Sequence, residues 1–147
     1  MRYREATQED IPVILEARQT DLEWGPADHR TGLYLKGEHH PQQALLPRVI
    51  IIALDGEALV GYIGGHLTTR YECDGELQYL WVAPEQRRRG VASGLLRLLT
   101  DWFAEREAKR ICVDVSYDNM GARAFYADRG AVKLVGPWLV WEDLATE

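Results

Sequence analysis

Cysteine is scarce in this chain of 147 residues, which has only Cys73 and Cys112. These two thiols form neither a metal-binding spacing nor a disulfide framework. Cys112 lies in an apolar run, which predicts a small buried core residue rather than a reactive thiol. The four histidines are scattered along the sequence. We therefore expect no metal site.

Long hydrophobic runs are also missing. The apolar run at residues 49–54 is far too short to cross a bilayer. Residues 1–5 lack the apolar segment of a signal peptide. These two absences predict a cytoplasmic protein without a membrane partner.

An excess of positive charge is absent as well, since 17 Lys and Arg residues face 23 Asp and Glu residues and leave a net charge of −6. General affinity for nucleic acid depends on neutralising phosphates with basic side chains, so this balance argues against it. A cationic partner such as an amine is compatible with it. Hydrophobic residues make up 46% and charged residues 27%, as in ordinary globular proteins. The length predicts a single domain over residues 1–147.

The hydrophobic periodicity predicts alternating helices and strands. A capping-like sequence at residues 7–10 precedes apolar residues at helical spacing, although Pro12 falls in the first turn and leaves the boundary open. The Gly- and Pro-containing segment 21–47 is expected to be irregular or a broken helix. Further helices are expected at residues 90–106 and after Asn119, which can act as a cap. Strands are expected at residues 49–54, 58–64, 76–82, 111–115, 131–135 and 138–142. This order indicates a mixed α/β domain.

The most informative segment is 80–96, a strand followed by three arginines and then by small residues that open an amphipathic helix. Backbone N–H groups at a helix start have no partner inside the helix, and the helix dipole adds positive charge there. Small side chains let an anion approach these groups closely, and the arginines supply counter-charge. The residues with these properties are Arg87, Arg88, Arg89, Gly90, Val91, Ala92, Ser93 and Gly94.

This combination suits a diphosphate-like ligand. A nucleotide P-loop requires a Gly-Lys-Ser/Thr ending, and a dinucleotide fingerprint requires G-x-G-x-x-G; neither is present. On the motif alone, a second interpretation stays open. In it Gly90 only relaxes a tight turn, and the arginines form a solvated surface.

Two motifs then resemble the GNAT acetyltransferase superfamily. The segment around Arg87, Gly90 and Ala92 is similar to the acetyl-CoA signature R/Q-x-x-G-x-G/A after a strand ending in V-x-P. The stretch 119–130 is similar to the family pattern N-x-x-A-x-x-F-Y-x-x-x-G-F, except that Ala131 stands where phenylalanine is usual. Residues 1–7 resemble the family's opening strand. The resemblance thus extends in outline over the whole chain.

The resemblance implies a mostly antiparallel central sheet with splayed middle strands, here 76–82 and 111–115, flanked by about four helices. It implies that acetyl-CoA enters the gap between these strands and binds at residues 87–94, with Asn119 capping its helix or contacting the pantetheine arm. The backbone N–H of Val82 would polarise the acetyl carbonyl. The acceptor amine then attacks the thioester directly in a ternary complex.

Two side chains carry catalytic roles by the same resemblance. Tyr126 corresponds to the tyrosine that protonates the leaving thiolate; alternatively it is a buried aromatic packed on Phe125. Glu76 lies where some members carry the general base that an alkyl amine needs; alternatively it is a solvated charge after a turn. Glu72 and Asp74 are reserve candidates for the base.

The acceptor is expected to bind at segments 21–47 and 67–74. Side chains that can line such a pocket are Trp24, His29, Tyr34, His40 and Tyr71, and acidic residues that suit a cationic amine or a peptide N-terminus are Asp21, Glu23, Glu72 and Asp74. A non-catalytic acyl-CoA sensor is the competing function, and a nucleic-acid patch at the three arginines is a third. The apolar strand over residues 138–141 suggests an edge through which two copies form a homodimer.

Overall fold

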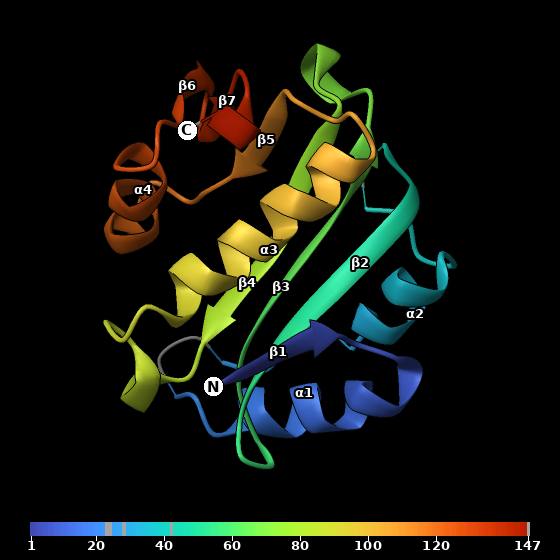
Figure 1. The fold of residues 1–147 in the computed structure, drawn as a ribbon, viewed down its shortest axis with the longest axis vertical. Helices are drawn as coiled ribbons and strands as arrows, with labels where there is room; N and C mark the ends of the chain where they lie inside the picture. The colour runs from blue at the N-terminus through green and yellow to red at the C-terminus, as the bar shows by residue number, and fades with distance from the viewer. Residues whose placement is uncertain (23–24, 28, 42, 147) are drawn as a thin grey trace.

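The computed structural model describes residues 1–22, 25–27, 29–41 and 43–146, and its seven strands form one sheet in the order β1-β2-β3-β4-β5-β7-β6 (Figure 1). The strands are β1 (Arg2–Glu5), β2 (Ala44–Asp55), β3 (Ala58–Thr68), β4 (Gly75–Val82), β5 (Ile111–Asp114), β6 (Val132–Val135) and β7 (Trp138–Trp141). The α-helices are α1 (Ile11–Gln19), α2 (Thr31–Lys36), α3 (Val91–Glu105) and α4 (Met120–Ala127). Only the β4–β5 pair is parallel. The predicted fold class is confirmed.

Strand β2 is apolar from Val49 to Leu54 because both faces of the sheet are covered there. Val49, Ile51 and Ala53 point to one side, where they join the core formed with α3. Ile50 and Ile52 point to the other side and pack with Ile11 and Tyr34 of the α1 and α2 layer. The alternation of a strand thus distributes one hydrophobic run between two cores.

Helix α1 starts where the capping pattern predicts. The backbone N–H of Thr7 donates to Asp10 Oδ2 over 2.7 Å, and the two residues form a capping box around a short 3₁₀ turn. Pro12 occupies the first turn of α1, where its missing N–H is tolerated. The proline therefore marks the helix start instead of breaking it.

The segment 21–47 is more regular than predicted. It contains α2, and β2 begins at Ala44, earlier than the expected residue 49. A register irregularity between Ala44 and Arg48 accounts for the difference, because it interrupts the alternation by which a strand is recognised from sequence. Within the described residues, no helix is long and apolar enough to span a membrane.

The C-terminal strand β7 is not an edge of the sheet. It pairs with β5 on one side and with β6 on the other, and all four of its residues are buried. The two edge strands of this sheet are β1 and β6. A homodimer formed by exposed backbone groups of residues 138–141 is therefore not available in this fold.

The parallel pair β4–β5 is short, and this fact positions the site. The register runs from Gly75–Ile111 to Leu77–Val113, after which β4 continues to Val82 while β5 ends at Asp114. The two strands diverge below this point (Figure 1). The splayed middle strands implied by the family resemblance are therefore present.

Candidate active site

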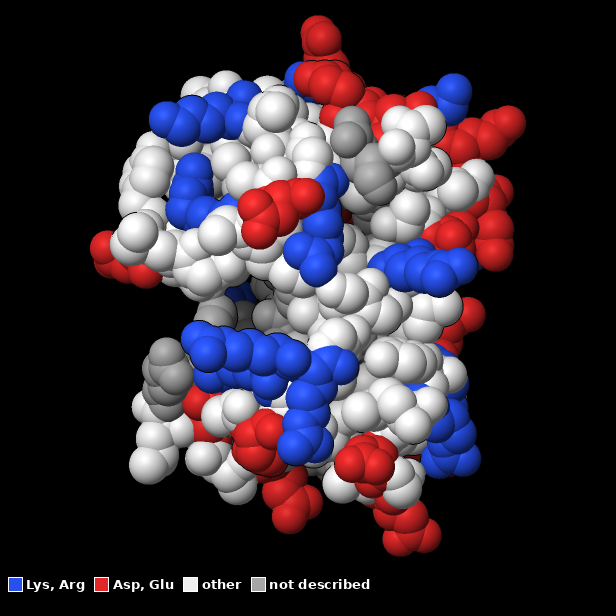
Figure 2. Space-filling view, turned by 60° about the vertical axis from the view of Figure 1, so that its left-hand side comes forward, with Lys and Arg blue, Asp and Glu red and all other residues white. Residues whose placement is uncertain are grey.

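A cleft of about 1100 Å³ opens where β4 and β5 separate. Its walls come from β4, the loop before α3, the first turn of α3, the end of β5 and helix α4. Figure 2 shows this face of the molecule hollowed, with Lys and Arg side chains gathered around the hollow. Arg87, Arg88 and Arg129 are the arginines in its lining, and Asp114 and Asp118 are the acidic residues there.

The loop before α3 presents backbone to the cleft. Gly90 is the N-cap of α3 in a left-handed conformation with φ of +84°, which a glycine adopts without steric cost. The residues from Gly90 through Ser93 all line the cleft. The first-turn N–H groups of α3 therefore lie at the cleft wall, where an anion can reach them.

Arg87 is held by the protein on two sides. Its Nε donates to the carbonyl oxygen of Val82 over 3.0 Å, and its Nη2 lies 3.0 Å from Asp21 Oδ2. The same carboxylate oxygen accepts from Trp81 Nε1 over 2.8 Å, and the Asp21 side chain is only 1% exposed. The first signature arginine thus ties the loop before α3 to the end of β4 and to the segment after α1.

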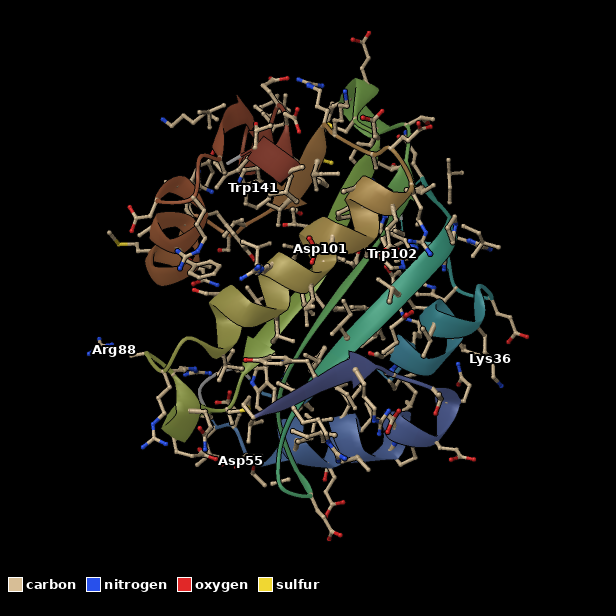
Figure 3. The ribbon with its side chains drawn as sticks, viewed as in Figure 1. Lys36, Asp55, Arg88, Asp101, Trp102 and Trp141 are labelled. Atoms are coloured by element: carbon tan, nitrogen blue, oxygen red, sulfur yellow. The ribbon has the colours of Figure 1, made fainter. Side chains whose placement is uncertain are left out.

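The other predicted cofactor residues divide into two groups. Arg88 lines the cleft and projects from the loop before α3 (Figure 3). Arg89 and Gly94 are not among the residues of its lining. A Cβ on Gly94 would lie 2.6 Å from the Tyr3 hydroxyl, so this glycine permits α3 to pack against β1. Close packing, and not access for an anion, accounts for Gly94.

Val82 presents backbone to the gap. Its neighbour Ala83 donates its N–H to Val60 of β3 over 2.8 Å, and Val82 is the residue opposite Gly61. In an antiparallel ladder this pattern turns the N–H and C=O of Val82 away from β3. On that side β5 no longer pairs with β4. The Val82 N–H therefore faces the cleft, as its predicted polarising role requires.

Helix α4 contributes Asn119 and Tyr126. Asn119 Oδ1 accepts from the backbone N–H of Ala122 over 3.1 Å, which confirms the predicted cap, and Asn119 also lines the cleft. Tyr126 lines the cleft while being 4% exposed, with its ring edge-to-face against Phe125 and Trp141. Burial raises the pKa of the Tyr126 phenol above its usual value. The hydroxyl is thus kept protonated, as a proton donor must be.

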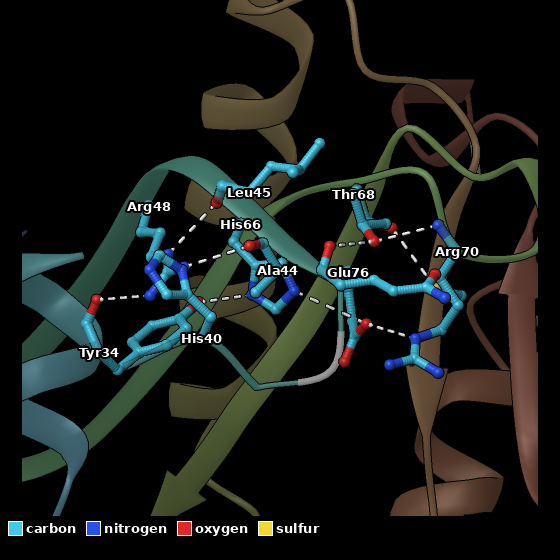
Figure 4. A network of polar contacts seen from close by, with 12 residues as sticks. Tyr34, His40, Ala44, Leu45, Arg48, His66, Thr68, Arg70 and Glu76 are labelled. Atoms are coloured by element: carbon cyan, nitrogen blue, oxygen red, sulfur yellow. Dashed lines mark hydrogen bonds and ion pairs between the residues drawn. The ribbon is translucent and has the colours of Figure 1, made fainter. Parts of the chain in front are cut away.

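Glu76 lies outside the lining of the cleft, in a buried polar network on the α2 side of the sheet (Figure 4). Its Oε1 is 3.3 Å from Arg70 Nε and 3.6 Å from His66 Nε2. The other ring nitrogen of His66, Nδ1, is 2.8 Å from the Tyr34 hydroxyl. Glu76 is 6% exposed, so it is not the solvated charge of the alternative interpretation.

The reserve bases differ in their surroundings. Asp74 Oδ2 accepts the backbone N–H groups of Lys109 and Arg110 over 2.9 and 3.0 Å, which holds the loop before β5 in place. Glu72 is exposed and has a left-handed φ of +61°. Neither lines the cleft.

The expected acceptor residues do not converge on one pocket. Tyr34 is fully buried, and Tyr71 packs edge-to-face against Trp138. His29 lines a second, open hollow beside α1, and His40 contacts Arg48. Glu23 and Trp24 lie outside the described residues.

The sequence motifs do not indicate several polar residues of the cleft, among them Arg129 and Gln78. Arg129 stacks on Phe125 with its guanidinium carbon 3.7 Å from the ring centroid, and its Nη2 donates to Ser93 Oγ over 2.5 Å. It thereby joins α4 to the first turn of α3. Gln78 lines the cleft from β4. Its signal in the sequence is a second polar side chain, after Glu76, in a strand that is otherwise mostly apolar.

Solved structures share this fold. The fold is similar to that of the Ard1 protein of Thermoplasma volcanium, with a TM-score of 0.73, 21% identity and coverage of 95% of this chain and 93% of that one. The fold is also similar to that of the PaiA N-acetyltransferase of Thermoplasma acidophilum, solved with coenzyme A. The TM-score is 0.71 and the identity 15%, with coverage of 95% of this chain and 95% of that one. An aminoglycoside 6′-N-acetyltransferase of Acinetobacter haemolyticus is similar with a TM-score of 0.70 and 20% identity, and the match covers 92% of this chain and 94% of that one. A search of curated proteins finds no significant match.

The fold and the cleft therefore define an acyltransferase architecture of the GNAT type. The family described as "Acetyltransferase (GNAT) family" matches residues 13–131, which include most of α1, the residues of the cleft lining and α4. The chain belongs to the GNAT acetyltransferase family.

Proposed function

We propose that this protein is an acetyl-CoA-dependent N-acetyltransferase that transfers an acetyl group to a primary amine. The observation that carries the proposal is the cleft itself. It joins the first turn of α3 at one end to Tyr126 and the separating strands β4 and β5. A long ligand with an anionic head and an apolar, hydrogen-bonding arm fits these surroundings.

The donors of the cleft suit such a ligand. Acetyl-CoA supplies a diphosphate for the α3 N–H groups and Arg88, and an acetyl thioester for the gap. Buried carboxamide oxygens of Gln78 and Gln86 line the same cleft and have no hydrogen-bond partner among the described residues. A ligand that carries N–H groups along its arm, as pantetheine does, complements a cleft with such acceptors.

The chemistry proceeds by direct attack. The Val82 N–H polarises the thioester carbonyl, so that the amine nitrogen forms the new C–N bond as the C–S bond breaks. Tyr126 gives its proton to the departing thiolate sulfur. Glu76 takes the proton that the amine loses. Because Glu76 lies behind the cleft lining, the proton reaches it through a bridging water molecule or after Arg70 has moved aside.

The experiment is a measurement of free CoA released from acetyl-CoA in the presence of a panel of primary amines, including polyamines, aminoglycosides and peptides with free N-termini. Transfer to at least one amine, with the acetylated product identified by mass, is the expected result. Binding of acetyl-CoA without transfer to any amine would favour the acyl-CoA sensor.

A further inference from the structure

Gln78 occupies an irregular position in β4. Leu77 pairs with Gly65 of β3 and Tyr79 pairs with Gly64, so Gln78 is an extra residue opposite two consecutive partners. A bulge of this kind re-aims its side chain away from the regular alternation. It also falls directly after Leu77–Val113, the last pair between β4 and β5. The side chain of Gln78 therefore stands at the point where the cleft begins.

The carboxamide oxygen of Gln78 is buried, while the residue as a whole is half-buried. Its Oε1 is inaccessible and accepts no hydrogen bond within the described part of the chain, although the residue lines the cleft. Burying a polar atom unpaired is costly, and native proteins rarely leave one so. The nearby lining residues Leu77 and Leu80 supply no donor side chain. The oxygen thus calls for a donor from outside the protein.

Other buried polar atoms without hydrogen bonds do not share this position. Glu76 Oε1 lies 3.3 Å from Arg70 Nε and 3.6 Å from His66 Nε2, in the polar network behind the cleft. Gln86 Oε1 belongs to the cleft, but it comes from the loop before α3, near the first turn of the helix. Asp143 Oδ1, the remaining such atom among the described residues, is not in the cleft lining, so Gln78 is the one of these groups that lines the cleft beside the last β4–β5 pair.

We infer that Gln78 is a substrate-binding residue whose Oε1 accepts a hydrogen bond from an N–H group of the reacting complex. The inference rests on the proposed function. Two N–H groups can reach the closed end of the cleft, an amide of the pantetheine arm or the nitrogen of the acceptor amine. Either one is buried there and needs an acceptor. The unpaired oxygen and the unpaired N–H complement each other.

The test is the Gln78→Leu variant, which keeps the approximate size and removes the acceptor. If pantetheine is the source, calorimetry will show affinity for acetyl-CoA about tenfold lower. Affinity for adenosine 3′,5′-bisphosphate, which lacks the pantetheine arm, will stay unchanged. If the amine is the source, acetyl-CoA affinity will be kept, while kcat/KM for the amine falls about tenfold. Gln19→Leu, at the exposed end of α1, is the matched control.

Gln78→Asn supplies a second variant if the leucine destabilises the bulge, because it keeps a carboxamide but withdraws its oxygen by one methylene. If Gln78→Asn lowers the same quantity as Gln78→Leu, either acetyl-CoA affinity or kcat/KM for the amine, and keeps the wild-type melting temperature, the result supports the inference. Acetyl-CoA affinity and turnover both within twofold of wild type would overturn it, as would an equal loss for adenosine 3′,5′-bisphosphate. Failure of the wild type itself to bind acetyl-CoA would instead overturn the proposed function together with this role.

Discussion

Asp21 Oδ2 lies 3.0 Å from Arg87 Nη2 and accepts from Trp81 Nε1 over 2.8 Å, with its side chain 1% exposed. This buried carboxylate links the segment after α1, the end of β4 and the loop before α3. Charge on Arg87 is thereby balanced inside the protein. Arg87 therefore has a structural role, because it holds the loop before α3 in place. Arg88 is the neighbouring cation, and its side chain projects from this loop (Figure 3).

Replacing Asp21 by Ala is expected to lower the free energy of unfolding by about 2–4 kcal/mol, because it leaves Trp81 and Arg87 without their buried acceptor. Urea unfolding measures this change. Asp55→Ala, at the exposed end of β2, is the control and should cost little. Equal stability of the Asp21 variant and wild type would show that the contacts of Asp21 with Trp81 and Arg87 do not stabilise the fold.

Replacing Tyr126 by Phe is expected to reduce kcat by about 10- to 100-fold while sparing acetyl-CoA affinity, because only the proton for the leaving thiolate is lost. Burial raises the pKa of Tyr126, so its phenol keeps its proton as pH rises through neutrality. No alkaline loss of kcat should come from this group below about pH 10. Unchanged turnover in the variant would remove the role.

Glu76→Gln tests the general base. Turnover is expected to fall about 100-fold, since the amide accepts no proton from the amine. Acetyl-CoA affinity should be kept because Glu76 lies outside the cleft lining. A variant with the wild-type rate at both high and low pH would show that Glu76 is not the base.

Gly94→Ala separates packing from ligand binding. The added Cβ would lie 2.6 Å from the Tyr3 hydroxyl and 2.9 Å from the ring carbon that carries it. Overpacking of this kind costs about 1–3 kcal/mol, which a shift of melting temperature reports. Acetyl-CoA affinity, measured below that temperature, should be unchanged. Weakened acetyl-CoA affinity in a fully folded variant would show that Gly94 belongs to the cofactor site.

Local features of the site could be predicted from the sequence. The Asn119 cap and the Gly90 turn depend on neighbours within a few residues, so their patterns are visible in the chain. Val82 and Tyr126 were expected at the cleft only because their positions match those of the family motifs. Both residues line the cleft in the structure.

Long-range features could not be predicted. The contact of Asp21 with Arg87 joins residues far apart in sequence, and nothing near either one announces it. The role of Gln78 depends on the register of β4 against β3, which a single extra residue changes. The close approach of Tyr3 to Gly94 could not be predicted for the same reason, because β1 and α3 meet only in the folded sheet.

The central claim is that the cleft binds acetyl-CoA at the loop before α3, and calorimetric titration of acetyl-CoA tests it most directly. Arg88→Glu and Arg89→Glu make the same charge change one residue apart, but only Arg88 lines the cleft. We expect micromolar binding by the wild type, weakened about tenfold or more by Arg88→Glu and less than threefold by Arg89→Glu. No binding by the folded wild type, or equal losses in the two variants, would contradict the account.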